Sequence, residues 1–280
     1  MNQKIKTLFC VLPLCAVLPA ALGYVMGPDN RVEITEEASD ADAIRQTGML
    51  RIQDEEFVSG LLTGENCDVV ISAGHAAIYW ESTPRKGWVK GEVRGKGKFR
   101  FNIDPEGGGD WQDMALVTSG YAHDDHVGKD EHDWSIFRIS SPALSDCKII
   151  SVLKDKQNCK SHLQMAGFHF DRPATKLIDR NCSVKRSAQS GIIVHDCDTK
   201  DGSSGSPLFC EYNGEFTLLA INISGLTNRD YYDAGVYGKS GRAFHYRQHK
   251  NFAIAVGGEF YHALMREMSA SKLRRNEEKR

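Results

Sequence analysis

Short hydrophobic segments separated by turn residues run through most of this chain from residue 48 onward. Turn signals such as Gly64-Glu65-Asn66, Asp201-Gly202 and Asn213-Gly214 lie between them. Many short strands with a turn about every 8–12 residues are typical of an all-β barrel or sandwich. The strands that the pattern predicts are Gly48–Gln53, Phe57–Leu62, Val69–Ser72, Gly97–Ile103, Met114–Thr118, Trp134–Ile139, Leu163–Phe168, Ile192–Asp196, Pro207–Cys210, Phe216–Ile223 and Asn251–Val256.

The end of the chain has a different period. Between Glu259 and Lys272 the apolar residues recur at helical spacing. They are Phe260, Leu264, Met265 and Met268. We therefore expect residues 258–280 to form an amphipathic helix packed on the β structure, followed by a solvated basic tail.

The first 23 residues have the three parts of a secretory signal peptide. Lys4 and Lys6 precede an uncharged apolar stretch from Leu8 to Leu22, and Ala21-Leu22-Gly23 supplies small residues for cleavage. The apolar stretch, at about 15 residues, is shorter than the ~20 that a membrane anchor needs. Cys15 does not indicate a lipoprotein, because the bulky Leu14 precedes it. We expect a secreted or periplasmic protein without a membrane segment after signal removal.

Residues 24–47 are polar and acidic, which predicts a leader, a propeptide or a loosely attached N-terminal arm. The whole chain has 280 residues, 41% of them hydrophobic, and a formal net charge of −2. This is an ordinary globular composition. No basic domain is present, which argues against a nucleic acid as partner.

Six cysteines remain after the predicted signal: Cys67, Cys147, Cys159, Cys182, Cys197 and Cys210. In an exported chain they allow up to three disulfides. No Cys-x-x-Cys pair occurs, which argues against a structural zinc site. Cys182 and Cys197 flank a short predicted strand, so we favour their pairing. For Cys210 both Cys159 and Cys147 stay open as partners.

Three segments together indicate nucleophilic catalysis by serine. Ser204 lies in the run Gly202-Ser203-Ser204-Gly205-Ser206-Pro207, His75 follows an apolar strand, and Asp133 precedes another. A serine hydroxyl needs an imidazole to take its proton, and the imidazole needs a carboxylate to hold its tautomer. The tight turn can aim the N–H groups of Gly202 and Ser204 at one point, as an oxyanion hole. Taken singly, each segment also fits an ordinary loop, a packed histidine or a turn aspartate.

With its His, Asp, Ser order, the chain resembles the trypsin/chymotrypsin-like serine proteases over about residues 45–270. Cys197-Asp198-Thr199 before the glycine-rich run is similar to the bacterial branch that includes the glutamyl endopeptidases. The resemblance implies two packed six-stranded antiparallel β-barrels, 48–140 and 141–257, with a C-terminal helix. It also implies hydrolysis of peptide bonds by a triad at the barrel interface, with a protein or peptide as substrate and no cofactor or metal.

Three positions depart from the family pattern. Ser203 stands where digestive proteases carry an Asp that pairs with the new N-terminal amine, so activation by an upstream protease cannot use that ion pair. Ala76 stands where a Cys is common, which leaves Cys67 without its usual partner. Asn222 stands where glutamyl endopeptidases have a pocket histidine.

For substrate selection, the resemblance places Asp198 and Thr199 at the floor of a specificity pocket and Asn222, Ser224 and Gly225 in its wall. An inward Asp198 would favour Lys or Arg beside the cleaved bond. An outward Asp198 would leave a neutral polar pocket. The resemblance favours the outward geometry, and we expect only weak selection of Glu.

Other polar clusters allow rival interpretations. His123, Asp124, Asp125 and His126, with Glu131-His132-Asp133, could ligate zinc or calcium and serve a metal-dependent hydrolase. A solvated loop is the plainer interpretation. His169 alternates with aromatic residues and is expected in a strand, whereas His195 could line the pocket or cap a strand. The main alternative to an endopeptidase is a catalytically silent protease-fold binding protein.

Overall fold

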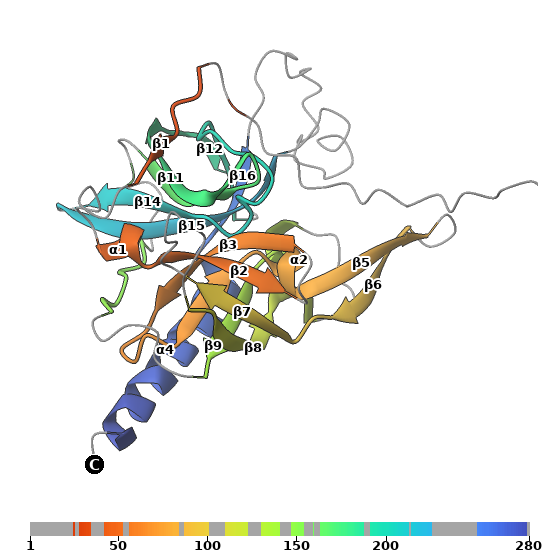
Figure 1. Cartoon of the computed structure of the whole chain (residues 1–280), viewed down its shortest axis with the longest axis vertical. Coiled ribbons are helices and arrows are strands. Elements are labelled where there is room, and N and C mark those ends of the chain that lie inside the picture. The colour runs from red at the N-terminus through yellow and green to blue at the C-terminus, as the bar shows by residue number, and fades with distance from the viewer. Residues whose placement is uncertain are drawn as a thin grey trace, which may run out of the picture.

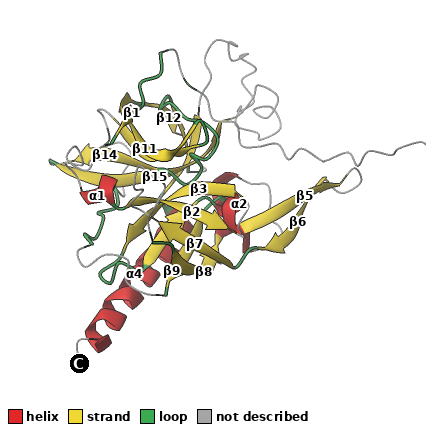
Figure 2. Ribbon diagram, in the orientation of Figure 1, coloured by secondary structure: helices red, strands yellow, loops and turns green. Residues whose placement is uncertain are grey.

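A computed structural model describes residues 25, 28–34, 42–52, 56–83, 87–100, 110–122, 130–140, 147–153, 159, 163–187, 191–212, 214–225 and 251–278. The predicted signal peptide and the cluster from His123 to His126 lie outside these residues. An all-β molecule with a C-terminal helix is confirmed (Figure 2).

The first half of the described chain closes into a six-stranded antiparallel barrel with the strand order β2-β3-β4-β9-β8-β7 (Figure 1). Pairing of β2 with β7 closes it. Successive side chains of a strand point to opposite faces, so neighbouring residues pack into two different cores. Val70 of β4 faces the barrel interior, whereas Val69 and Ile71 face the second half of the molecule. The strands are β2 (Thr47–Ile52), β3 (Glu56–Thr63), β4 (Val69–Ser72), β7 (Lys96–Arg100), β8 (Gln112–Ser119) and β9 (Ser135–Ile139).

Two further strands, β5 (Ile78–Thr83) and β6 (Gly87–Val93), pair only with each other among the described strands. They form a ribbon that projects from the side of the barrel (Figure 1). The hydrophobic pattern did not predict this ribbon.

The second half is a curled antiparallel sheet of eight strands with the order β1-β11-β10-β14-β15-β16-β13-β12 (Figure 1). It differs from the closed six-stranded barrel that the resemblance implied, because the described strands leave two edges and β1 adds to one of them. The strands are β1 (Val32–Glu33), β10 (Leu163–His169), β11 (Arg172–Cys182), β12 (Val184–Ser187), β13 (Ile192–His195), β14 (Pro207–Tyr212), β15 (Glu215–Gly225) and β16 (Asn251–Ala255).

Two disulfides lie in this second half. Cys182 pairs with Cys197, as the flanking of a short strand predicted. Cys159 pairs with Cys210. Of the two partners that the sequence left open for Cys210, Cys159 is therefore the one found in the structure. Three of these cysteines are buried in one apolar cluster, and Cys159 packs against it.

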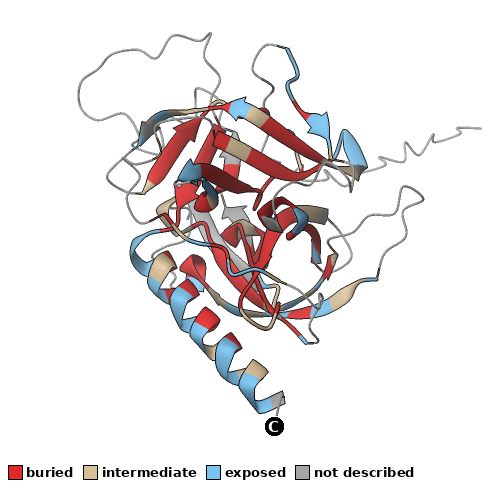
Figure 3. Ribbon diagram, turned by 90° about the vertical axis from the view of Figure 1, so that its left-hand side faces the viewer, coloured by how far each residue is buried: buried red, intermediate tan, exposed pale blue. Residues whose placement is uncertain are grey.

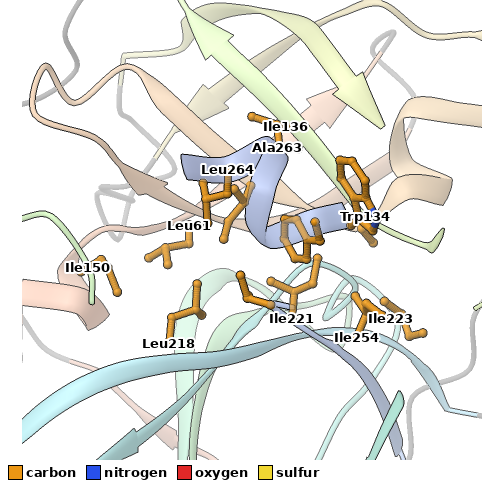
Figure 4. Close-up of a cluster of buried hydrophobic side chains, with 14 of the residues drawn as sticks. Leu61, Trp134, Ile136, Ile150, Leu218, Ile221, Ile223, Ile254, Ala263 and Leu264 are labelled. Atoms are coloured by element: carbon orange, nitrogen blue, oxygen red, sulfur yellow. The ribbon is translucent and has the colours of Figure 1, made fainter. Parts of the chain in front are cut away.

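Helix α4 (Gly258–Glu278) crosses the junction between the two halves. One face packs through Phe260, Ala263 and Leu264 into an apolar core that both halves share (Figure 4). The other face is exposed (Figure 3). Phe260 stacks on Trp134, with ring centroids 5.1 Å apart. The helix therefore ties the residue after Asp133 to the interface between the halves.

Short helical segments complete the described chain: α1 (Asp42–Arg45), α2 (Gly74–Ala77), and the 3-10 turns η2 (Gly120–Ala122) and η4 (Asp130–His132). Within the described ranges, no helix has both the length and the apolar composition needed to cross a membrane.

Candidate active site

His75 and Asp133 meet because the strands beside them are paired. Ser72 at the end of β4 lies opposite Ser135 at the start of β9. The chain segments just beyond those two ends must therefore run side by side. The Ser135 hydroxyl donates to the carbonyl of Ala73 at 2.7 Å and holds the two segments together.

The Asp133 carboxylate contacts His75 at two places. Nδ1 of the imidazole lies 2.9 Å from Oδ2 and 3.1 Å from Oδ1. The backbone N–H of His75 also donates to Oδ1, at 2.8 Å. Together these contacts fix the ring against the carboxylate, with Nδ1 as the protonated nitrogen. That tautomer leaves Nε2 as the basic nitrogen, which is what a general base at this position requires.

Tyr121 in η2 is a further partner of Asp133 that sequence reasoning missed. Burial, followed by the charges of Asp133 and Asp130, raises the pKa of the Tyr121 hydroxyl well above its usual value. A hydrogen bond to Asp133 acts in the same direction. The hydroxyl therefore stays protonated and can donate to the carboxylate. No local pattern marks this tyrosine, because the contact depends on the fold of the η2 turn.

Residues 201–206, named the nucleophile loop for the role that the sequence predicts for Ser204, turn tightly around that residue. Gly202 and Gly205 have φ angles of +92° and +81°, which side chains other than glycine adopt at a cost. The turn is closed by two backbone hydrogen bonds: Ser203 N–H donates to Lys200 and Ser206 N–H donates to Ser203. The two glycines are thus a geometric requirement of this turn.

The nucleophile loop docks directly on the first barrel. The backbone N–H of Ser59 in β3 donates to the carbonyl of Ser204 at 2.7 Å. The Ser59 hydroxyl donates to the carbonyl of Gly202 at 3.2 Å. A side chain at Gly205 would lie 2.0 Å from the Ser59 carbonyl and 2.2 Å from the Ser72 hydroxyl. Since Ser72 ends the strand that leads to His75, the docking places Ser204 on the His75 side of the barrel.

Ser204 itself is almost buried, at 6% exposed. Its hydroxyl donates to the carbonyl of Ile223 at 3.4 Å. Within the part of the chain that the structure describes, the N–H groups of Gly202 and Ser204 donate to no acceptor. Two such N–H groups on a tight turn are the arrangement that an oxyanion hole needs.

Asp198 lies against the N-terminal segment. Its carboxylate accepts the backbone N–H of Asn30 at 2.7 Å, and its own N–H donates to Asp179 at 2.9 Å. Asp198 and Thr199 are both fully buried. Through the bond from Asn30, the Asp198 carboxylate is engaged with the N-terminal segment.

The segment around Asn30 is anchored by a buried arginine, Arg31. Its guanidinium pairs with Asp29 at 2.9 Å and with Asp171 at 2.6 Å. The Arg31 hydrogen bond lowers the pKa of Asp29 to about 2. This polar part of the chain was expected to be a leader or a loosely attached arm. Of its described residues, Val32 and Glu33 form β1 and pair with β11.

The resemblance assigned Asn222 to the wall of the specificity pocket. It is 1% exposed. Its amide contacts Ser203 and His195, which leaves no amide hydrogen for a substrate side chain. Ser224 and Gly225 pair with β16 through their backbones, and the Ser224 side chain lies outside the description.

Of the histidines and carboxylates considered for metal binding, the structure describes Glu131, His132 and Asp133. Asp130–His132 form η4, where His132 Nδ1 lies 3.7 Å from the Glu259 carboxylate of α4. Asp133 is engaged with His75. No three ligand-type side chains come together in the described ranges, which leave out the stretch from His123 to His126. His169 ends β10, as expected, and its Nδ1 accepts the N–H of Lys200 at 3.1 Å.

Comparison with known proteins gives similarity in structure alone. No protein-family model matches the chain, and no curated protein sequence does. A solved Glu endopeptidase in complex with MPD superposes with a TM-score of 0.60 at 13% identity, covering 88% of this chain and 99% of its own. The chain has a chymotrypsin-like serine protease fold.

A second solved structure supports this fold. It is a thermostable serine protease, AL20, from an extremophilic microorganism, with a TM-score of 0.54 at 17% identity. The alignment covers 82% of this chain and 99% of that one. The likeness extends over both halves and identifies a protease-fold protein. The chemistry has to be argued from this chain's own residues.

Proposed function

We propose that this protein is an exported serine endopeptidase that hydrolyses peptide bonds through an acyl-enzyme. The observation that carries the proposal is the contact of His75 with the buried Asp133 carboxylate. This contact lies on the side of the first barrel on which the nucleophile loop docks. These contacts hold the imidazole in the tautomer that a general base needs.

In the proposed reaction, Ser204 Oγ leaves the Ile223 carbonyl and attacks the carbonyl carbon of the cleaved bond. His75 Nε2 takes the hydroxyl proton as the new C–O bond forms, and then gives it to the leaving amine as the C–N bond breaks. Water then attacks the acyl ester, giving its proton to His75, and the ester C–O bond breaks as His75 returns the proton to Ser204. Asp133 keeps its charge throughout and stabilises the imidazolium.

The N–H groups of Gly202 and Ser204 stabilise the oxyanion that forms in both steps. Hydrogen bonds aimed at a developing charge stabilise the transition state more than the ground state. Removal of one such donor in a serine protease typically costs about 10²–10³ in kcat.

For the residue beside the cleaved bond, the contacts support a neutral pocket. Asp198 is tied to Asn30, and no charged side chain takes the family histidine's place at Asn222. We expect a modest preference for polar side chains with weak selection of Glu. Strong selection of Lys or Arg that disappears in Asp198→Ser would contradict this expectation.

A fluorophosphonate probe tests the reaction class. The probe should label the wild type and Ser269→Ala, a variant of an exposed α4 serine, and should fail to label Ser204→Ala. His75→Ala should label very slowly. A chelator should leave labelling unchanged. Activity that the chelator abolishes, with no labelling, would instead support a metal-dependent hydrolase.

One observation favours a second candidate, a binding protein of protease fold without turnover. The Ser204 hydroxyl points to the Ile223 carbonyl in this structure. A protein locked in that state would bind a peptide without cleaving it. The probe separates the two, because a serine that cannot reach an imidazole would not react even though the fold is intact.

A further inference from the structure

Asn222 on β15 lies directly behind the nucleophile loop. Its backbone N–H donates to the carbonyl of Ser206 at 2.8 Å, and its carbonyl accepts the N–H of Gly205 at 2.7 Å. Its amide Nδ2 lies 3.1 Å from both the carbonyl and the hydroxyl of Ser203. One residue therefore contacts the loop on both sides of Ser204.

The hydrogen-bonding capacity of each group decides how this network is oriented. The Ser203 carbonyl can only accept, so the Asn222 amide must turn its NH₂ group towards it. The amide oxygen then faces His195 Nε2, at 3.1 Å. An oxygen cannot donate, so His195 must carry its proton on Nε2. Burial lowers the pKa of His195 to about 4, which leaves a neutral ring with a single N–H at pH 7.

The peptide group between Ser203 and Ser204 connects this network to the chemistry. A trans peptide is planar, and its C=O and N–H point in opposite directions. Holding the Ser203 carbonyl against Asn222 therefore aims the Ser204 N–H away from the sheet interior. That N–H is one of the two proposed oxyanion donors.

We propose that Asn222, itself held by His195, is a positioning residue that sets the Ser203–Ser204 peptide plane and so orients the oxyanion hole. The inference rests on the proposed function of Ser204. At the position of Ser203 the resemblance implied an Asp that pairs with a new N-terminal amine in digestive proteases. A neutral network lies there in this chain, and it needs no free amine.

Asn222→Asp tests the inference, with Asn251→Asp as its matched control. Asn251 is also fully buried, on the adjacent strand β16, and its Nδ2 donates to the carbonyl of Cys197 at 2.7 Å. Both variants replace an amide donor by a carboxylate of the same shape. Asn222→Asp should lower kcat at least 100-fold with KM within about threefold of the wild type, the signature of a lost transition-state interaction. Asn251→Asp should keep kcat within about threefold.

A pair of variants at His195 provides the rescue. Glutamine can place an N–H where Nε2 lies, so His195→Gln should keep kcat within about fivefold. His195→Leu leaves the Asn222 oxygen without a donor and should lose at least tenfold. Equal losses in the two variants would show that His195 merely fills space, and would overturn its part in the network.

A second readout does not depend on turnover. Amide hydrogen exchange of Gly205 and Ser206 should be at least tenfold faster in Asn222→Asp than in the wild type, and unchanged in Asn251→Asp. Unchanged exchange, or a kcat within threefold of the wild type, would overturn the positioning role. A wild type that neither turns over nor reacts with the fluorophosphonate would instead contradict the proposed function, and exchange would still decide the orientation of the loop.

Discussion

The two sides of the proposed site are held in different ways. His75 and Asp133 follow directly from strand pairing, because β4 and β9 are neighbours in register and both residues lie at the same end. Ser204 lies on a turn that is held by hydrogen bonds from two other places, Ser59 in the first barrel and Asn222 in the curled sheet. Backbone pairing thus builds the acid–base side, whereas specific polar contacts build the nucleophile side.

This difference predicts that the two sides fail differently when they are changed. On the acid–base side a single substitution should change the chemistry and leave the fold intact. On the nucleophile side a substitution should disturb the local backbone and lower stability as well.

Asp133→Asn should have the largest effect. The amide would donate to Nδ1 and favour the wrong tautomer of His75, so kcat should fall by about 10⁴-fold. The unfolding midpoint should stay close to that of the wild type. Steady-state kinetics and thermal unfolding measure the two quantities. Asp130→Asn, three residues earlier, serves as control, and an equal loss there would contradict the assignment of Asp133.

Gly205→Ala should damage both activity and stability. The new methyl group would lie 2.0 Å from the Ser59 carbonyl, and the residue would keep a φ of +81°. Overpacking and strain of this kind typically cost about 1–3 kcal/mol each. We expect urea unfolding to show a loss of this size together with nearly complete loss of turnover. Gly214→Ala, at a φ of +78° with open space around it, isolates the cost of the backbone angle alone.

Removal of the Cys182–Cys197 disulfide should weaken the nucleophile side. The bond closes a 15-residue separation just before the nucleophile loop. Loss of a native disulfide typically costs about 2–5 kcal/mol. The double variant Cys182→Ala with Cys197→Ala should lose stability in this range by urea unfolding. A loss of activity without any loss of stability would point to a different role for this bond.

Acid should destabilise the nucleophile side through its buried histidines. Burial lowers the pKa of His195 to about 4 and that of His169 to about 3, against an ordinary value of 6.5. As the pH falls below 6.5 the unfolded chain binds protons at these sites and the folded chain does not, so stability falls with pH. For His195 alone the loss reaches about 3 kcal/mol by pH 4.

Urea unfolding at several pH values measures this effect. His195→Gln removes one of the two titrating groups and should flatten the pH dependence between pH 6.5 and pH 4. Asp29 and Asp171, whose pKa values are lowered by Arg31, contribute mainly near and below pH 4, where the unfolded carboxylates take up protons. An unchanged slope in His195→Gln would mean that this ring titrates normally in the folded protein.

Tyr121→Phe should have the smallest effect. It removes the hydroxyl from Asp133 and leaves the ring in the barrel core. A hydrogen bond from a neutral hydroxyl to a charged group is worth about 1.5–3 kcal/mol. His75 keeps its own contacts with the carboxylate. We expect kcat to fall by about three- to tenfold with KM unchanged. A loss as large as that of Asp133→Asn would make Tyr121 an essential part of the site.

Local pattern was sufficient for much of the fold. A short apolar run predicted β4 with its bounds, and helical spacing predicted α4, because each depends on neighbours within a few residues. The same pattern missed β1, the β5–β6 ribbon, β11 and β12. Their sequences are rich in polar residues, so they lack the short hydrophobic segments on which the prediction depended.

For the site, the sequence by itself determined the candidate residues, since His75, Asp133 and Ser204 lie in recognisable motifs whose order is informative. It also indicated the Cys182–Cys197 bond. The assignment of the three as a catalytic triad stays a prediction that the kinetic experiments address.

Only the tertiary structure decided which polar group meets which. Asn222 and Asp198 were placed in a specificity pocket by resemblance, but a residue's type does not say which donor its oxygen faces. The partners of Asn222 lie 19 and 27 residues away, and Asn30 lies 168 residues from Asp198. Hydrogen bonds are directional and short, so contacts at such separations exist only once the packing of the sheets has brought the segments together.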